Sequence, residues 1–180
     1  DSDLAVIAQR RGGHNRLGFA VQLCYLRFPG LALQPEEAPA PELLVFVAKQ
    51  LRLDPKLWLL YAQRPQTRRE HLVELQSWLS LKPFGPDSSQ HLVEQLAALA
   101  QQTDHGHTLA LALIEMLRKE RVILPPIDVV ERTCAEGLTR GTRKIHETLT
   151  SSLQTEHRLA LDRLLANREG SNTSQLFWLR

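Results

Sequence analysis

The sequence predicts an all-α fold, a bundle of several helices, on three observations. Apolar residues recur every three or four positions along most of the chain, the period of a helix with one buried face. Prolines, glycines and capping residues separate these periodic segments. No segment alternates apolar and polar residues as a half-buried strand does. With 180 residues, of which 43% are hydrophobic, the chain can bury a real core.

The first helices are expected within residues 1–86, which we predict to form one small helical subdomain. An amphipathic helix runs up to Phe28 and ends at Pro29-Gly30. A proline-rich loop follows over residues 30–42, and the segment PELLVFVAKQLRL forms the next helix.

Two short helices joined by a tight turn are expected between Pro55 and Leu79. Asp54 is a suitable N-cap for the first helix, because its carboxylate accepts a hydrogen bond from a free backbone N–H. Thr67-Arg68-Arg69-Glu70 has the spacing of a capping box and is expected to begin the second. This organisation predicts a helix-turn-helix-like unit.

Longer helices are expected within residues 87–180, the second predicted subdomain. One covers Leu92–Leu99, and LALALIEML, apolar nearly all round, predicts a buried central helix. VILPP is too short for more than an extended connector. A helix then runs from about Asp128 towards Leu149, with Gly137 or Gly141 as the point of a bend, and another carries Leu153, Leu161, Leu164 and Leu165. The last residues, TSQLFWLR, are typical of the first turns of a helix, so this subdomain is expected to be truncated at its C-terminal end.

Composition excludes several classes of protein. Cys24 and Cys134 lie far apart inside apolar stretches, which argues against a disulfide framework and indicates a reducing compartment. No apolar run is long enough to span a membrane, and the first residues lack the order of a signal peptide. We therefore expect a protein of the reducing cytosol.

The positive charge is concentrated, although the formal net charge is only +2. Arg118, Lys119 and Arg121 are explained by the last turn of a helix, whose dipole favours cations. Three other basic segments are candidate DNA contacts. These segments contribute Arg10, Arg11, His14, Asn15 and Arg16; Arg64, Thr67, Arg68, Arg69 and His71; and Arg140, Arg143 and Lys144.

Each candidate segment also has an ordinary structural explanation. Arg68 and Arg69 are expected in the first turn of a helix, where the dipole disfavours cations and a phosphate or a guanine edge would compensate. Glu70 and Glu74 could neutralise them instead. Asn15 could cap a helix rather than contact DNA, and the run from Arg140 to Lys144 could be a solvated face.

Catalytic and metal-binding chemistry is not predicted. His105-Gly106-His107 has only Asp104 beside it and no third ligand within sequence reach, so we expect no metal site. The acidic residues form no cluster suited to two metal ions, and we expect no catalytic residue and no cofactor. The aromatic side chains of Trp58, Tyr61 and Trp78 fall on apolar faces and are expected in the core.

Several segments resemble the opening region of Tn-three-family replicative transposases. These are RRGGHNRLGFAVQLCYLRFPG, FVAKQL and YAQRPQTRREHLVELQSWL, followed in the same order by RKERVILPPIDVVER and LDRLL. The resemblance implies a non-catalytic, sequence-specific DNA-binding module that recognises double-stranded transposon terminal inverted repeats. It also implies that strand transfer belongs to an Asp-Asp-Glu domain with divalent metal, far downstream and absent from this chain.

The matching motifs include two of the three basic segments, those around His14 and around Arg68, which favours DNA contact there. The alternative is a helical interaction module that joins transposase protomers, giving a homodimer through the full-length protein, or docks on the catalytic core. The leucine-rich segment from Leu153 to Leu165 supports this alternative.

Overall fold

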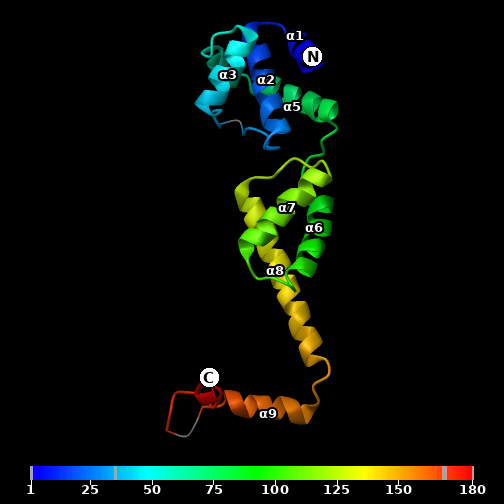
Figure 1. The fold of residues 1–180 in the computed structure, drawn as a ribbon, viewed down its shortest axis with the longest axis vertical. Helices are drawn as coiled ribbons and strands as arrows, with labels where there is room; N and C mark the ends of the chain where they lie inside the picture. The colour runs from blue at the N-terminus through cyan, green and yellow to red at the C-terminus, as the bar shows by residue number, and fades with distance from the viewer. Residues whose placement is uncertain (1, 35, 168–169, 180) are drawn as a thin grey trace.

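The computed structural model describes residues 2–34, 36–167 and 170–179, and this part of the chain is all-α, as predicted. Figure 1 shows an elongated molecule with two helical lobes and an arm that ends in a helix lying across it. The α-helices are α1 (Ser2–Ala8), α2 (Gly13–Arg27), α3 (Pro41–Leu51), α4 (Leu57–Ala62), α5 (Pro65–Leu79), α6 (Pro86–Leu99), α7 (Gly106–Lys119), α8 (Ile127–Thr150) and α9 (Thr155–Leu165). A 3-10 helix, η1, covers Leu176–Leu179.

The first lobe is built around α2, whose residues from Leu17 to Leu23 are all buried. Helices α3, α4 and α5 pack on α2, and α4 has the most extensive contact with it. A Cβ atom built on Gly18 would lie 2.2 Å from the ring of Tyr61, so only glycine permits this approach. Trp58 and Tyr61 are buried beside it, as their apolar positions predict.

The second lobe consists of α6, α7 and the first half of α8. Helix α8 is continuous through Gly137 and Gly141, where a bend was predicted. Both glycines are buried against α6, where an added Cβ would lie 2.6 Å from the Leu96 Cβ and 2.7 Å from the Ala97 carbonyl oxygen, respectively. Their lack of a side chain therefore allows two helix backbones to approach closely.

Residues after α7 connect the two lobes. The Ile123 N–H donates to the Lys82 carbonyl (2.9 Å), and the Leu124 N–H donates to the Gly30 carbonyl (2.9 Å). Ile123 belongs to the apolar cluster of the first lobe, while Val122 belongs to that of the second. The predicted extended connector thus pairs with both lobes, and it crosses the top of the second lobe in Figure 1.

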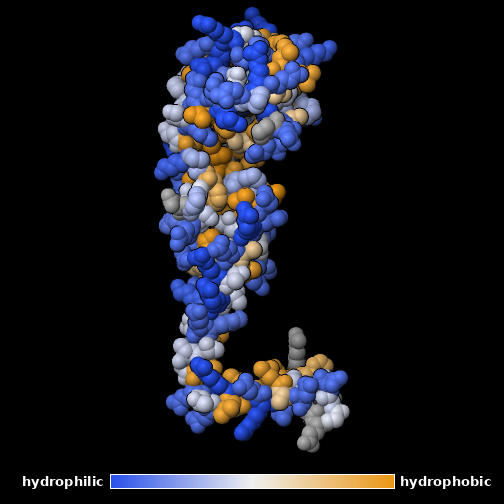
Figure 2. Space-filling view, turned by 180° about the vertical axis from the view of Figure 1, so that it is seen from behind, coloured by the Kyte–Doolittle hydropathy of each residue, from blue (hydrophilic) through white to orange (hydrophobic). Residues whose placement is uncertain are grey.

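The arm consists of the last turns of α8 and helix α9. The apolar side chains of Leu149, Leu159, Leu161 and Leu165 are exposed, and none of the described residues of α9 is buried. Figure 2 shows orange side chains along this arm among blue ones. The arm presents an apolar surface that the described residues leave uncovered.

Two helix starts differ from the prediction. Helix α4 begins at Leu57, after a turn in which Asp54 Oδ1 accepts from the Lys56 N–H (2.9 Å). Helix α5 begins at Pro65, and no side chain caps it, so the capping box at Thr67 is wrong. Proline is favoured at a first helical position, because its fixed φ suits the helix and its missing N–H would have no partner there.

Three further differences concern burial and helix content. Helix α7 is amphipathic rather than buried all round, because Leu111 is 51% exposed while Leu109 and Leu113 are fully buried. Trp78 is 47% exposed, so its predicted core position is wrong. Helix α1 was not predicted, and its short sequence buries only Val6 and Ile7.

Buried side chains fall into two clusters, one from the first lobe with Ile123 and one from the second. The division into units at residue 86 stays a prediction. In the described part of the chain, no helix has the length and apolar character that crossing a membrane requires.

Gly18→Ala is expected to destabilise the protein by about 1–3 kcal/mol or more, because the new methyl group overlaps the Tyr61 ring. The measurement is the free energy of unfolding from urea titration. Gly106→Ala is the control, since an added Cβ there meets nothing within 4 Å. Equal stability of the Gly18→Ala variant and the unmodified chain would contradict the packing described.

Candidate nucleic-acid interface

Helices α4 and α5 are joined by the two-residue turn Gln63-Arg64. The turn is tight because Arg64 donates its N–H to the Tyr61 carbonyl (3.0 Å) and Pro65 begins the next helix at once. The arrangement is two short helices with a tight join, in the segment where the sequence predicts a helix-turn-helix-like unit.

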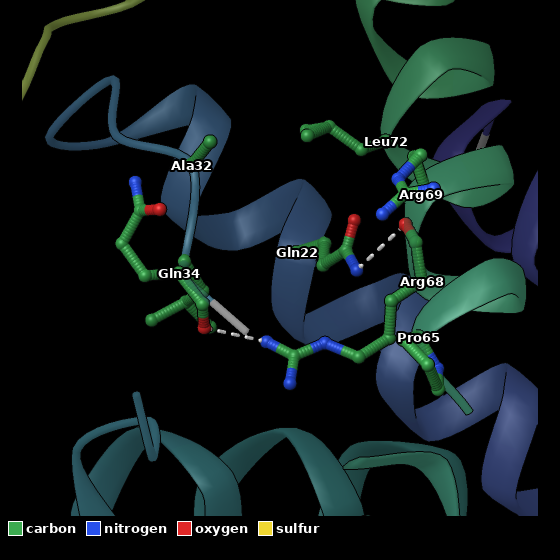
Figure 3. Close-up of a pocket in the computed structure, with 8 residues that line it drawn as sticks. Gln22, Ala32, Gln34, Pro65, Arg68, Arg69 and Leu72 are labelled. Carbon is green, nitrogen blue, oxygen red and sulfur yellow. Dashed lines mark hydrogen bonds between the residues drawn. The ribbon is translucent and has the colours of Figure 1, made fainter. Parts of the chain in front are cut away.

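The side chain of Arg68 is buried, with 5% of the residue exposed. Its Nη2 donates to the Gln34 carbonyl (2.8 Å), and its guanidinium lies 5.6 Å from the centroid of the Trp58 ring. Figure 3 shows the side chain reaching from α5 to the loop that carries Gln34. Arg68 therefore ties the loop after α2 to the start of α5.

A buried polar network lies between α2, α4 and α5. The Gln22 amide donates to the Tyr61 hydroxyl (2.7 Å) and to the Arg68 carbonyl (3.3 Å). The Tyr61 oxygen also lies within hydrogen-bond distance of His71 Nδ1 (3.0 Å). Burial raises the pKa of Tyr61, so its hydroxyl keeps the proton.

His71 is 7% exposed and packs edge-on against Phe19, with ring centroids 5.1 Å apart. Burial, with a further contribution from the nearby Arg10 guanidinium, lowers the pKa of His71. His71 therefore belongs to the core, and direct DNA contact by His71 or by Arg68 would require the lobe to open. DNA contact by these two residues therefore stays a prediction.

The accessible candidates of this segment lie around the start of α5. Arg64 and Arg69 are exposed, and Thr67 is half-buried. Arg69 lines a hollow of about 150 Å³ together with Gln22 and Leu72 (Figure 3). Neither Arg64 nor Arg69 has an ion-pair partner among the described residues, so both guanidiniums are available for an anion.

The loop before α2 is tied to α5 through Arg10. The Arg10 guanidinium forms an ion pair with Glu74 (2.5 Å) and lies 4.7 Å from the centroid of the Phe19 ring. Arg11 is exposed, and its carbonyl accepts from the side-chain amide of Asn15 (3.0 Å), so Asn15 does not cap the helix.

His14 and Arg16, in the first turn of α2, are half-buried. Gly12 has a φ of 81°, which favours glycine, and an added Cβ there would lie 3.0 Å from the His14 ring. The glycine pair thus allows the chain to turn closely around this ring. Of the three arginines predicted as contacts in this segment, Arg11 is exposed, while Arg10 and Arg16 are half-buried.

The third basic segment lies on α8, in the second lobe. Arg140 forms ion pairs with Glu94 of α6 and with Glu136 one turn earlier, and Arg143 lies 3.8 Å from Glu147. Lys144 is exposed and has no ion-pair partner in the part of the chain that the structure describes. The neutralised arginines are less suited to phosphate binding than the guanidiniums at the start of α5.

Sequence reasoning missed Gln22, which holds the network beneath the start of α5. A single polar residue inside the apolar run from Leu17 to Leu26 was the available signal. A buried amide needs hydrogen-bond partners, and such a residue indicates an internal polar contact.

The fold and this surface define an all-α module that exposes unpaired guanidiniums beside a short helix-turn-helix-like join. Residues 1–137 match the family model described as "Domain of unknown function (DUF4158)". The chain therefore belongs to this family.

Curated relatives are transposases. Over its whole length the chain is 52% identical to the transposase for transposon Tn3926 of Escherichia coli and 51% identical to that for Tn21 of the same organism. It is 49% identical to the transposase for Tn501 of Pseudomonas aeruginosa. The chain spans 18% of the length of each of these relatives, so it corresponds to a segment of a Tn-three-family transposase, as the motifs predicted.

Stability is expected to fall as the pH is lowered from 7.5 to 5.5, because His71 resists protonation in the folded state. The unfolded chain takes up a proton near pH 6.5, while the folded chain does so only at lower pH. The folded state is therefore favoured above the unfolded pKa and loses up to about 1.4 kcal/mol per pH unit below it.

Urea titrations at the two pH values measure this loss, with His71→Gln as the comparison. The variant is expected to lose less stability between pH 7.5 and 5.5 than the unmodified chain does. An identical pH dependence in both proteins would show that His71 is not the group responsible.

Proposed function

We propose that this chain is a sequence-specific DNA-binding module of a transposase, which recognises the terminal inverted repeats of its transposon. The observation that carries the proposal is the pair of exposed, unpaired guanidiniums at the start of α5, Arg64 and Arg69. Backbone N–H groups at a helix start also favour anions, so phosphates and guanine edges are suitable ligands there.

In this proposal α5 lies in the major groove with its first turns towards the bases. The exposed face of those turns carries Gln66 and Arg69, and both side-chain types pair with purine edges in two-bond geometry. Arg68 and His71 act from the core, because the Arg68 carbonyl accepts from Gln22 of α2 and the His71 ring packs against Phe19 of α2. Arg64, Thr67 and Arg11 contact phosphate oxygens in this proposal.

The segment from Arg10 to Arg16, which includes the first turn of α2, is expected to shift when DNA binds. Buried side-chain atoms of Arg10, His14, Asn15 and Arg16 have no hydrogen-bond partner among the described residues. Each unsatisfied buried polar atom costs about 1–3 kcal/mol. A movement that brings the Nε–H donors of Arg10 and Arg16 to phosphates would recover part of that energy.

Lys144 and Arg143 would add phosphate contacts from the second lobe, with Arg140 held in its ion pairs.

The chain itself is non-catalytic in this proposal, and strand transfer of the Asp-Asp-Glu type belongs to the rest of a larger protein. Its place of action is the bacterial nucleoid, where transposon ends lie.

Arg69→Ala is expected to reduce discrimination between a transposon-end duplex and a scrambled duplex by about 1–3 kcal/mol, with stability unchanged. Binding of duplexes from the ends of Tn3926, Tn21 and Tn501 is compared by fluorescence anisotropy. Arg132→Ala is the matched control, since Arg132 is an exposed cation on α8 outside the proposed interface.

Arg68→Ala distinguishes the structural role proposed for Arg68 from the base contact proposed for Arg69. It is expected to lower the free energy of unfolding, because it leaves the Gln34 carbonyl without the guanidinium.

Sequence-specific recognition by α5 would be refuted if the unmodified chain bound all end duplexes and the scrambled duplex with equal affinity, and if Arg69→Ala left these affinities unchanged.

A second candidate function is self-association through the arm, which would make the chain a helical interaction module. The uncovered apolar side chains of Leu159, Leu161 and Leu165 on α9 favour it. Light scattering without DNA decides between the two: a mass that rises with concentration supports self-association, and a constant monomer mass excludes it.

A further inference from the structure

A groove lined by arginines lies at the junction of the two lobes. Two adjoining hollows, of about 340 and 270 Å³, share Arg27 at the end of α2 and Arg121 after α7. The larger hollow is also lined by Arg118, from the last turn of α7. Three guanidinium-bearing residues from both lobes thus border one continuous depression.

Hydrogen bonds fix the backbone and one side chain of this groove. Arg118 Nη2 donates to the Pro29 carbonyl (3.2 Å), and its guanidinium lies 5.9 Å from the centroid of the Phe28 ring. The Arg121 carbonyl accepts from the Lys82 N–H (2.8 Å), which joins the end of α7 to the connection after α5. Residues of both lobes therefore fix the positions of these arginines.

The positive charge of the groove is only partly neutralised. Arg27 donates to Asp3 (2.7 Å), while Arg118 and Arg121 have no ion-pair partner in residues 2–34, 36–167 and 170–179. The linings of both hollows lie within these ranges and contain no carboxylate. A helix dipole explains one cation in each last turn, but not the gathering of three around one groove.

We propose that this groove binds the phosphodiester backbone of duplex DNA. The inference rests on the proposed function and extends it to residues that the sequence assigned to helix ends. Guanidiniums spread over two lobes suit a run of phosphates better than a single ion, and each neutralised phosphate releases condensed counterions.

Arg121→Gly tests the proposal without harming the fold. Arg121 has a φ of 56° in the turn that closes α7, and glycine adopts this left-handed conformation more easily than arginine. Arg52→Gly is the matched control: Arg52 has a φ of 55°, closes α3 in the same way, is exposed, and lies outside both hollows.

Arg121→Gly is expected to weaken binding of specific and scrambled duplexes alike, by roughly three- to tenfold, and to reduce the salt slope by about 0.9. Its thermal midpoint should be equal to or above that of the unmodified chain. Arg52→Gly should leave affinity and slope unchanged. Unchanged binding by Arg121→Gly, or equal losses in both variants, would overturn the proposal.

Two further comparisons distinguish duplex binding from binding of a free anion, and failure of the groove proposal from failure of the proposed function. Inorganic phosphate, compared with chloride at equal ionic strength, should shift the thermal midpoints of the unmodified chain and of Arg121→Gly equally. A rise that Arg121→Gly abolishes would assign a free-anion site and overturn the duplex assignment. If Arg69→Ala loses discrimination while Arg121→Gly binds normally, only the groove proposal fails. If the unmodified chain shows no discrimination and Arg121→Gly still weakens binding with a smaller slope, only specific recognition fails.

Discussion

The close approach of α2 and α4 at Gly18 is the constraint on which the first lobe depends. It places the Tyr61 hydroxyl within reach of Gln22 and His71, and Gln22 also binds the Arg68 carbonyl in α5. Three helices are thereby fixed by one buried amide and one buried hydroxyl. In such a network the loss of one partner leaves another polar group unsatisfied. Hydrogen bonds, in addition to apolar packing, therefore set the orientation of α5.

Local sequence signals predicted most of the helices. The period of the apolar residues located α2, α3, α6, α7 and α8, and Pro29-Gly30 marked the end of α2. Where two start signals competed, as at Pro65 and Thr67, proline at the first helical position prevailed over the capping box. The helix-packing role of Gly137 and Gly141 depends on α6, which lies far away in sequence, and local patterns therefore suggested a bend.

The candidate site was less predictable, because burial of a charged residue depends on contacts that sequence spacing does not contain. Arg68 and Arg69 are neighbours in one basic run, yet Arg68 is buried beside Trp58 and Arg69 is exposed. Arg140 is neutralised by Glu94, 46 residues earlier in the chain. Arg121 was assigned to a helix end, and only the pairing of the connector with both lobes places it at their junction.

The central claim is that the exposed turns at the start of α5 lie against DNA bases while Arg68 stays in the core. Backbone and arginine side-chain chemical shifts, measured by NMR as a transposon-end duplex is added, test this most directly. The account predicts large changes at Gln66 and Arg69, with the Arg68 side chain keeping its contact to Gln34. Changes confined to α9, with none in α5, would contradict it.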